Sequence, residues 1–235
     1  MTAEEIVAQL RPLGSDGYKK ILLNHGVKEP VFGVKIEELK KIQKKVKTDY
    51  QLALDLYDTG IYDAMYLAGL IADDLKMTKK DLNRWAKGAC CSSISEYTVS
   101  WVAAGSNHGH ELAIEWIESK NEGIASAGWN TLSHLVALRD DKQLDLPELK
   151  KLLARVQKTI HNQPNRVRYC MNGFVISVGG YVKDLTELAL QTSDKVGAVS
   201  VNMDGTACKV PSARDYIEKI QKRGAIGKKR KTVKC

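Results

Sequence analysis

Hydrophobic residues along this chain recur at intervals of three and four, the period of an amphipathic α-helix. Residues 36–46 show the pattern well, with Ile36, Leu39, Ile42 and Val46 on one face and lysines on the others. Similar segments begin near these residues: Thr2, Asp16, Asp49, Ile61, Thr78, Ser92, Asn107, Glu122, Pro147, Asn165, Asp184 and Pro211. The pattern predicts an all-α protein of about a dozen helices joined by short links.

Prolines and glycines mark the ends of these segments. All five prolines fall between segments or at their starts, where a missing N–H is best tolerated. Asp145, just ahead of Leu146-Pro147, predicts a helix start, and Gly14, Gly26, Gly60 and Gly105 predict helix ends. Residues 196–210 depart from the helical period, because valines alternate with smaller residues around an Asn202-Met203-Asp204-Gly205 turn. We expect a small hairpin or an extended crossing there.

The helix pairs recur about every 35–45 residues, although no side-chain signature repeats strictly. This spacing predicts a degenerate HEAT-like solenoid with a curved concave face. We expect one helical-repeat domain over residues 1–226 and a basic C-terminal tail over residues 227–235. A concave surface of this kind suits a DNA duplex as well as another protein, so the fold alone does not decide the function.

Composition excludes several classes of protein. No run approaches the roughly 18 apolar residues of a membrane-spanning helix, and the N-terminus lacks the basic and apolar regions of a signal peptide. The five cysteines are an odd number without metal-ligand spacing. We therefore expect a cytoplasmic protein with reduced thiols and without a metal site.

The net charge of +8 is concentrated at the C-terminal end. Residues 209–235 hold ten lysines and arginines against two acidic residues, whereas the rest of the chain is balanced at 26 of each. A local positive field favours a polyanion such as DNA, because binding releases the counterions condensed on its phosphates. The alternative is a lysine-rich tail that only aids solubility.

Three stretches of the sequence resemble a known family. The first places an aromatic-Gly-Val-Lys motif, Phe32-Gly33-Val34-Lys35, at a predicted helix start. The second is Asp55-Leu56-Tyr57, followed by a helix through Ala64, Ala68 and Gly69. The third is the C-terminal end, with Ala207-Cys208-Lys209-Val210-Pro211 and Gly227-Lys228-Lys229-Arg230-Lys231-Thr232. Over roughly residues 30–235 the chain resembles the DNA alkylation repair family, the AlkD-like glycosylases.

This resemblance implies a HEAT-like solenoid whose concave face holds DNA. It also implies hydrolysis of the N-glycosidic bond of N3- and N7-alkylated purines without a cofactor. An alkylated purine is already cationic, so the protein needs chiefly a carboxylate near the oxocarbenium-like sugar and aromatic faces for the cation. Active members carry a Trp-Trp-Asp stretch, followed three residues later by the catalytic Asp.

The chain departs from that family pattern at its centre. The corresponding stretch is Cys90-Cys91-Ser92-Ser93-Ile94-Ser95-Glu96-Tyr97, in which small residues replace both tryptophans. The catalytic Asp falls on Ser95, or on Glu96 if the alignment shifts by one residue. An arginine that the family places in a later helix is absent near residues 125–129. Glu96 is the candidate catalytic residue, and the other interpretation makes it a solvated surface glutamate.

Several further residues are candidates for DNA binding. Basic side chains that would reach phosphates are Lys35 in the family motif, Arg166 and Arg168 near a helix start, and Lys228, Lys229, Arg230 and Lys231 in the tail. For the two arginines the alternative is a solvated loop between repeats. Aromatic candidates that would face the groove are Trp129, Tyr169 and Phe174, with burial in the core as the alternative, whereas Trp101 and Trp116 are assigned to the core.

Three functional hypotheses follow. The first is a monomeric repair protein that binds double-stranded DNA and excises alkylated purines through Glu96. The second is a DNA-structure binder that kept the groove and lost the catalytic acid. The third is a protein-binding helical scaffold. Binding that weakens steeply with salt separates the first two from the third.

Overall fold

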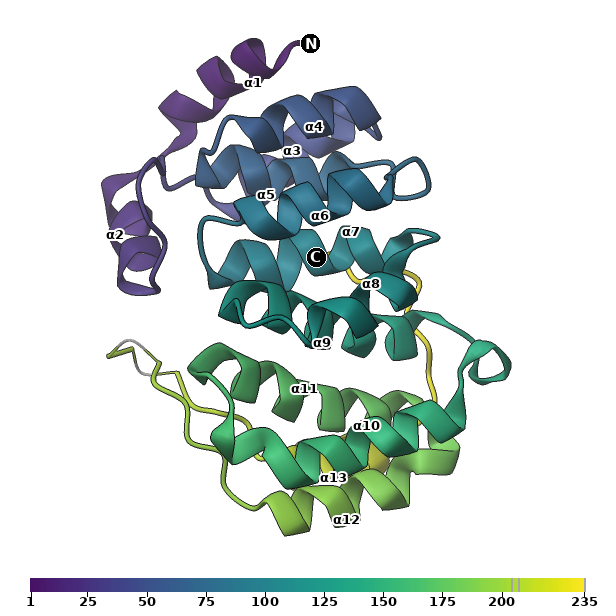
Figure 1. Cartoon of the computed structure of the whole chain (residues 1–235). Coiled ribbons are helices and arrows are strands. Elements are labelled where there is room, and N and C mark those ends of the chain that lie inside the picture. The colour runs from purple at the N-terminus through teal and green to yellow at the C-terminus, as the bar shows by residue number, and fades with distance from the viewer. Residues whose placement is uncertain (204, 207, 235) are drawn as a thin grey trace.

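The computed structural model describes residues 1–203, 205–206 and 208–234, and helices dominate it (Figure 1). The described part of the chain contains thirteen α-helices and one π-helical segment, η2. Their bounds are α1 Ala3–Leu10, α2 Asp16–Asn24, α3 Ile36–Val46, α4 Tyr50–Asp58, α5 Tyr62–Ile71, α6 Lys79–Gly88, η2 Ile94–Val99, α7 Ser100–Gly105, α8 Gly109–Trp116, α9 Glu122–Leu138, α10 Leu146–Thr159, α11 Asn165–Tyr181, α12 Thr186–Val196 and α13 Ala213–Lys222.

Side-chain caps determine where many of these helices begin. Thr78 and Asp81 form a reciprocal capping box at the start of α6. Asp145 accepts a hydrogen bond of 2.9 Å from the backbone N–H of Glu148, ahead of Pro147 in the first turn of α10. The helix start predicted at Asp145 is thereby confirmed.

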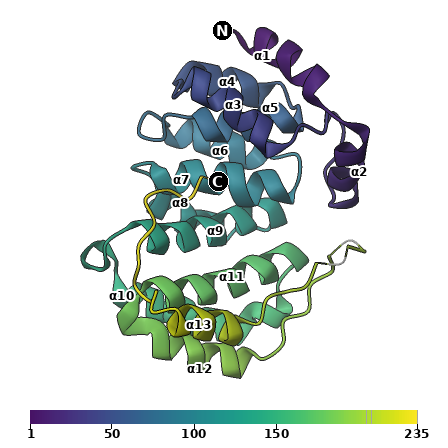
Figure 2. The same cartoon turned by 180° about the vertical axis from the view of Figure 1, so that it is seen from behind.

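The helices are stacked in two layers. An inner layer of α5, η2 with α7, α9, α11 and α13 packs side by side and faces the viewer in Figure 2. An outer layer of α4, α6, α8, α10 and α12 lies toward the viewer in Figure 1. The predicted all-α solenoid is confirmed. Among the described residues, no helix has the length and apolar character needed to cross a membrane.

The core consists of two hydrophobic clusters that meet at α9. The first runs from α1 to α9 and includes the buried side chains of Leu67 and Trp85. The second runs from α9 to α13 and includes Trp129, Met171 and Phe174. Any contact that spans the two clusters therefore holds the two halves of the solenoid in register.

The motif at residues 32–34 positions α2 beside the inner layer. The buried carboxylate of Asp63, at the start of α5, accepts hydrogen bonds of 2.6 and 2.7 Å from the backbone N–H groups of Phe32 and Val34. Gly33 between them has φ +79° and lies so close to α2 that a Cβ would fall 2.6 Å from the Lys19 nitrogen. The sequence needs glycine here for both reasons.

The described residues between α12 and α13, which are 197–203, 205–206 and 208–211, form no helix. The described residues of this segment contain no β-strand, so the hairpin alternative is wrong there and the extended crossing is correct. Asp204 and Ala207 of the predicted turn lie outside the described residues. A hairpin would pair the Asn202 backbone with a second strand, but here it pairs with a side chain. The Asn165 amide donates to the Asn202 carbonyl at 2.8 Å, and its oxygen accepts from the Asn202 N–H at 2.7 Å.

The basic C-terminal end packs back on the inner layer as a strap over residues 227–234 (Figure 2). The Gly227 N–H donates to the carbonyl of Gly180 in α11, at 2.9 Å, and the Arg230 N–H donates to the carbonyl of Ala137 in α9, at 2.8 Å. The Val233 side chain is 7% exposed and belongs to the first hydrophobic cluster. The strap therefore connects the two halves of the solenoid.

Two lysines of the strap sit at helix C-termini, where exposed carbonyls and the helix dipole favour a cation. The Lys229 ammonium donates to the Val136 carbonyl at 2.8 Å and pairs with Asp141 at 2.7 Å. The Lys234 ammonium donates to the Ala72 carbonyl at 3.0 Å and pairs with Asp74 at 2.7 Å. Part of the positive charge of the C-terminal end therefore stabilises the fold by binding helix carbonyls.

Removal of residues 227–235 should destabilise the fold. The deletion exposes the surface under Val233 and breaks several hydrogen bonds, so we expect the free energy of unfolding to fall by about 2–5 kcal/mol. Urea denaturation measures the change. Lys231→Ala, an exposed position in the same strap, is the matched control and should stay within about 0.5 kcal/mol of the parent. A deletion as stable as the control would show that the strap does not hold the halves together.

Stability should also depend on the protonation of Asp74. Burial raises the pKa of this carboxyl to about 6, while Lys234 lowers it. The folded protein therefore binds more protons than the unfolded chain between pH 4 and 6, and the free energy of unfolding decreases as pH rises through that window. Relative to Asp74→Asn, the parent protein should lose stability between pH 4.5 and pH 7 in urea titrations. A constant difference between the two proteins would contradict this assignment.

Candidate nucleic-acid groove

Two adjoining cavities lie along the inner layer, and together we call them the inner groove. The first, of about 530 Å³, lies between α2, η2, the start of α11 and the residues Met203, Cys208 and Lys209. The second, of about 360 Å³, lies between η2, α9, α11 and α13, with Arg230 of the strap among its lining residues. Glu96, Tyr97 and Tyr169 line both cavities, so the two form one continuous surface.

A buried ion pair lies between these cavities. Arg166, in the first turn of α11, donates from Nε to Glu96 Oε1 at 2.7 Å and from Nη2 to Glu96 Oε2 at 2.6 Å. The Glu96 side chain is 1% exposed. Burial raises the pKa of Glu96, and the hydrogen bonds and charge of Arg166 lower it. Because both carboxylate oxygens accept from one guanidinium, the geometry is that of the ionised pair.

Neighbouring groups fix both partners of the pair. The ring centroid of Tyr169 lies 4.4 Å from the Arg166 Cζ, so the guanidinium covers one face of that ring. The backbone N–H of Arg166 donates to Glu122 at 2.6 Å. On the other side, the Glu96 carbonyl accepts from Asn130 Nδ2 at 2.8 Å and from the Ser100 hydroxyl. Glu96 itself lies in the π-helical segment η2, a geometry that often marks functional sites.

Of the predicted acidic and aromatic site residues, two line the inner groove and two are buried in the core. Glu96 lies in the groove but is buried and paired, so its interpretation as a solvated surface residue is wrong. Tyr169 lines both cavities as expected. Trp129 and Phe174 are fully buried and contact each other edge to face at 5.3 Å. Their predicted exposure to the groove is wrong, because the two rings fill the interface between α9 and α11.

The predicted cations are also divided. Arg166 lines the first cavity and Arg230 the second. Arg168 is half-buried beside Asn165, with 3.4 Å between its Nη2 and the amide oxygen. Lys229 is held by the end of α9. The remaining three, Lys35, Lys228 and Lys231, are exposed but line neither cavity.

Apart from Tyr169, sequence reasoning missed the tyrosines of the groove. Six of the nine tyrosines line one or both cavities: Tyr18, Tyr62, Tyr97, Tyr169, Tyr181 and Tyr216. They come from α2, α5, η2, α11 and α13, so no local motif brings them together. Lys209, at the rim of the first cavity, is a further exposed cation that was not singled out.

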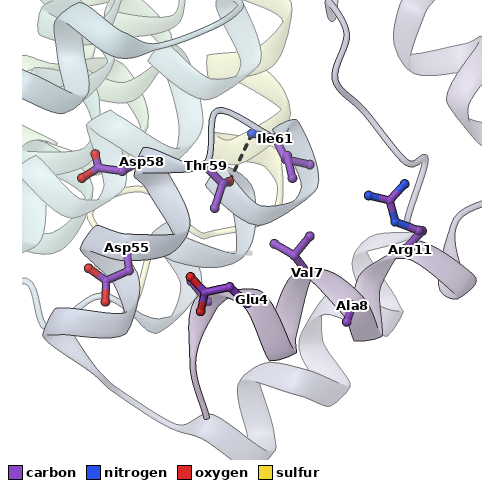
Figure 3. A pocket seen from close by; sticks show the side chains of 9 residues that line it. Glu4, Val7, Ala8, Arg11, Asp55, Asp58, Thr59 and Ile61 are labelled. Carbon is purple, nitrogen blue, oxygen red and sulfur yellow. Dashed lines mark hydrogen bonds between the residues drawn. The ribbon is translucent and has the colours of Figure 1, made fainter.

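A third cavity lies elsewhere, between α1 and the end of α4 (Figure 3). It measures about 620 Å³. Figure 3 shows Glu4, Asp55 and Asp58 on one side of it and Arg11 on the other. Three carboxylates against one guanidinium repel phosphate, so this cavity does not suit a nucleic acid.

Comparisons with known proteins agree with this architecture. The profile of the family described as "DNA alkylation repair enzyme" matches residues 6–217. Uncharacterized proteins Lin0241 of Listeria innocua and Lmo0209 of Listeria monocytogenes are each 34% identical over 229 residues, covering 95% of this chain and 99% of theirs. A solved structure is similar to this chain with a TM-score of 0.93 and 37% sequence identity. The match covers 100% of this chain and 100% of the solved one. It is described as belonging to "a new family of proteins related to the HEAT-like repeat DNA glycosylases with affinity for branched DNA structures".

Breaking one half of the ion pair should destabilise the protein more than replacing both halves. Arg166→Met leaves the buried Glu96 carboxylate without a partner, which costs about 3–5 kcal/mol. Combining it with Glu96→Gln removes the stranded charge, so the double variant should be clearly more stable than Arg166→Met alone. Urea denaturation of both single variants and the double variant completes the cycle. Additive losses would show that the two side chains are not energetically coupled.

Proposed function

The chain belongs to the DNA alkylation repair enzyme family, and from that premise we propose that it binds branched DNA in the inner groove without excising alkylated bases. The observation that carries the proposal is the closed pair between Glu96 and Arg166. Glycosidic hydrolysis in this family needs a carboxylate free to face the developing positive charge on the sugar. Here both oxygens of Glu96 are already occupied by the guanidinium.

No other side chain in residues 90–97 replaces the Glu96 carboxylate. Ser95, the other position onto which the family's catalytic Asp falls, is 2% exposed and carries a hydroxyl that stays neutral. The positions of the two family tryptophans hold Cys90 and Cys91, which offer no aromatic face to a cationic purine. The groove keeps the shape that DNA requires and lacks the parts that cleave the glycosidic bond.

Affinity for branched DNA is supported by the relative of known structure and by the cations around the groove. That relative matches the whole chain and is described as having such affinity. Lys209 and Arg230 are exposed at the first and second cavities, where they can contact the phosphates of two DNA arms. We further propose that the protein binds the double-stranded arms as a monomer.

We also propose that the protein works in the cytoplasm. The free thiols of Cys90, Cys91, Cys170 and Cys208 support this location, because the cytoplasm keeps cysteines reduced.

Two assays on the same protein test this proposal. In fluorescence anisotropy, a four-way junction should bind more tightly than a linear duplex of the same length, and binding should weaken steeply between about 50 and 200 mM salt. Incubation with methylated DNA should release no N3- or N7-methylpurine, while a family member with the Trp-Trp-Asp stretch serves as the positive control. Release of free base would contradict the absence of excision. Absence of salt-sensitive DNA binding would refute the proposal itself.

The groove cations provide a second test. Lys209→Gln and Arg230→Gln should each weaken junction binding and reduce the slope of log K against log salt by about 1, as expected for one lost phosphate contact. Lys151→Gln is the matched control, because this exposed lysine lies on α10 in the outer layer. Equal effects at all three positions would show that the inner groove is not the DNA-binding surface.

A further inference from the structure

We propose that the second cavity of the inner groove receives one unpaired base from the branch point of the DNA. This inference rests on the proposed function and adds a specific ligand to it. The cavity of about 360 Å³ lies at the small end of the range of ligand pockets, which begins near 300 Å³. It is therefore a pocket for a single planar group, and the duplex arms stay outside it.

The aromatic walls of this cavity carry the inference. Among the described residues, the only aromatic side chains that are exposed are Tyr97, at 42%, and Tyr216, at 50%. Both line the second cavity, Tyr97 from η2 and Tyr216 from α13. Two exposed rings in one pocket offer a base the stacking surface that single-strand binding proteins use.

Tyr97 is also held in place before any ligand arrives. Its ring lies 5.7 Å from that of Trp101, which is buried and meets Tyr66 edge to face at 5.4 Å. Tyr169 offers less surface, because the guanidinium of Arg166 covers one of its faces. A supported ring that remains exposed loses little conformational entropy when a base stacks on it.

Polar groups in the cavity suit the edge of a base. Asn130, Ser133, Ser177 and His134 all line it. Burial lowers the pKa of His134 to about 4, so its imidazole is neutral. Amide and hydroxyl groups such as those of Asn130 and Ser177 can donate to and accept from the edge of a base.

The positive charge of the cavity and the energy needed to unstack a base both favour a base from a branch point. Arg230 lines the same cavity and can hold the phosphate beside an inserted nucleotide. Extracting a base from a duplex means unpairing and unstacking it, a penalty that is smallest for a base that is already unpaired. A junction supplies such a base and an intact duplex does not.

Anisotropy with two matched probes tests the inference. One probe is a three-way junction with a single unpaired adenine at the branch point, and the other carries an abasic nucleotide there. The parent protein should bind the adenine junction about 5- to 150-fold more tightly, the range measured for one base–aromatic stack. Tyr97→Ala and Tyr216→Ala should each bring that ratio toward 1, whereas Tyr97→Phe should keep it. Leu75→Ala, at a side chain 69% exposed that lines neither cavity of the groove, is the control and should also keep it.

The outcomes separate this inference from the proposed function. Salt-sensitive binding of both junctions with equal affinity would overturn the base pocket and leave the DNA-binding proposal intact. Retention of the parent ratio in both alanine variants would likewise overturn it. Failure to bind either junction would instead refute the proposed function. The two tyrosines lie on different helices, so loss of folding in one variant leaves the other as a valid test.

Discussion

The buried pair between Glu96 and Arg166 is the interaction on which the groove depends. It joins two residues 70 positions apart and connects η2, in the first half of the solenoid, to α11, in the second. A carboxylate that is 1% exposed is tolerated only with a partner of matching geometry, and the guanidinium supplies two parallel hydrogen bonds. The same pair that fixes the groove occupies both oxygens of the carboxylate that was the candidate for hydrolysis. In the function that we propose, the structure of the groove and the absence of base excision therefore have a single physical cause.

The solenoid is held at both ends of its inner helices. Near their N-termini the ion pair connects the two halves, and at their C-termini the strap connects α11, α9 and α5 through Gly227, Arg230 and Lys234. Between these two connections lie the tyrosine-lined cavities. The excess of lysine and arginine at the C-terminal end thus has two roles. Lys229 and Lys234 satisfy helix carbonyls, while Arg230 remains exposed at the groove.

Local signals in the sequence predicted most of the fold. The helical period and caps such as Thr78 and Asp145 act within a few residues, so they can be interpreted without tertiary structure. The groove depends on contacts between distant segments. Nothing near Glu96 in the sequence indicates Arg166, and nothing near Trp129 distinguishes a groove residue from one that packs on Phe174. Residues 197–211 show the same limit, because the Asn165 side chain replaces the partner strand that a hairpin would require.

The most direct test of this account is the Nε–Hε resonance of Arg166 in nitrogen-edited NMR spectra, recorded with and without branched DNA. The account predicts a sharp signal that exchanges slowly with water in both states, because the proton stays bonded to Glu96 when the groove is filled. A signal that broadens or exchanges rapidly once DNA is added would show that the pair opens. Glu96 would then be free to face the sugar, and the central claim would be contradicted.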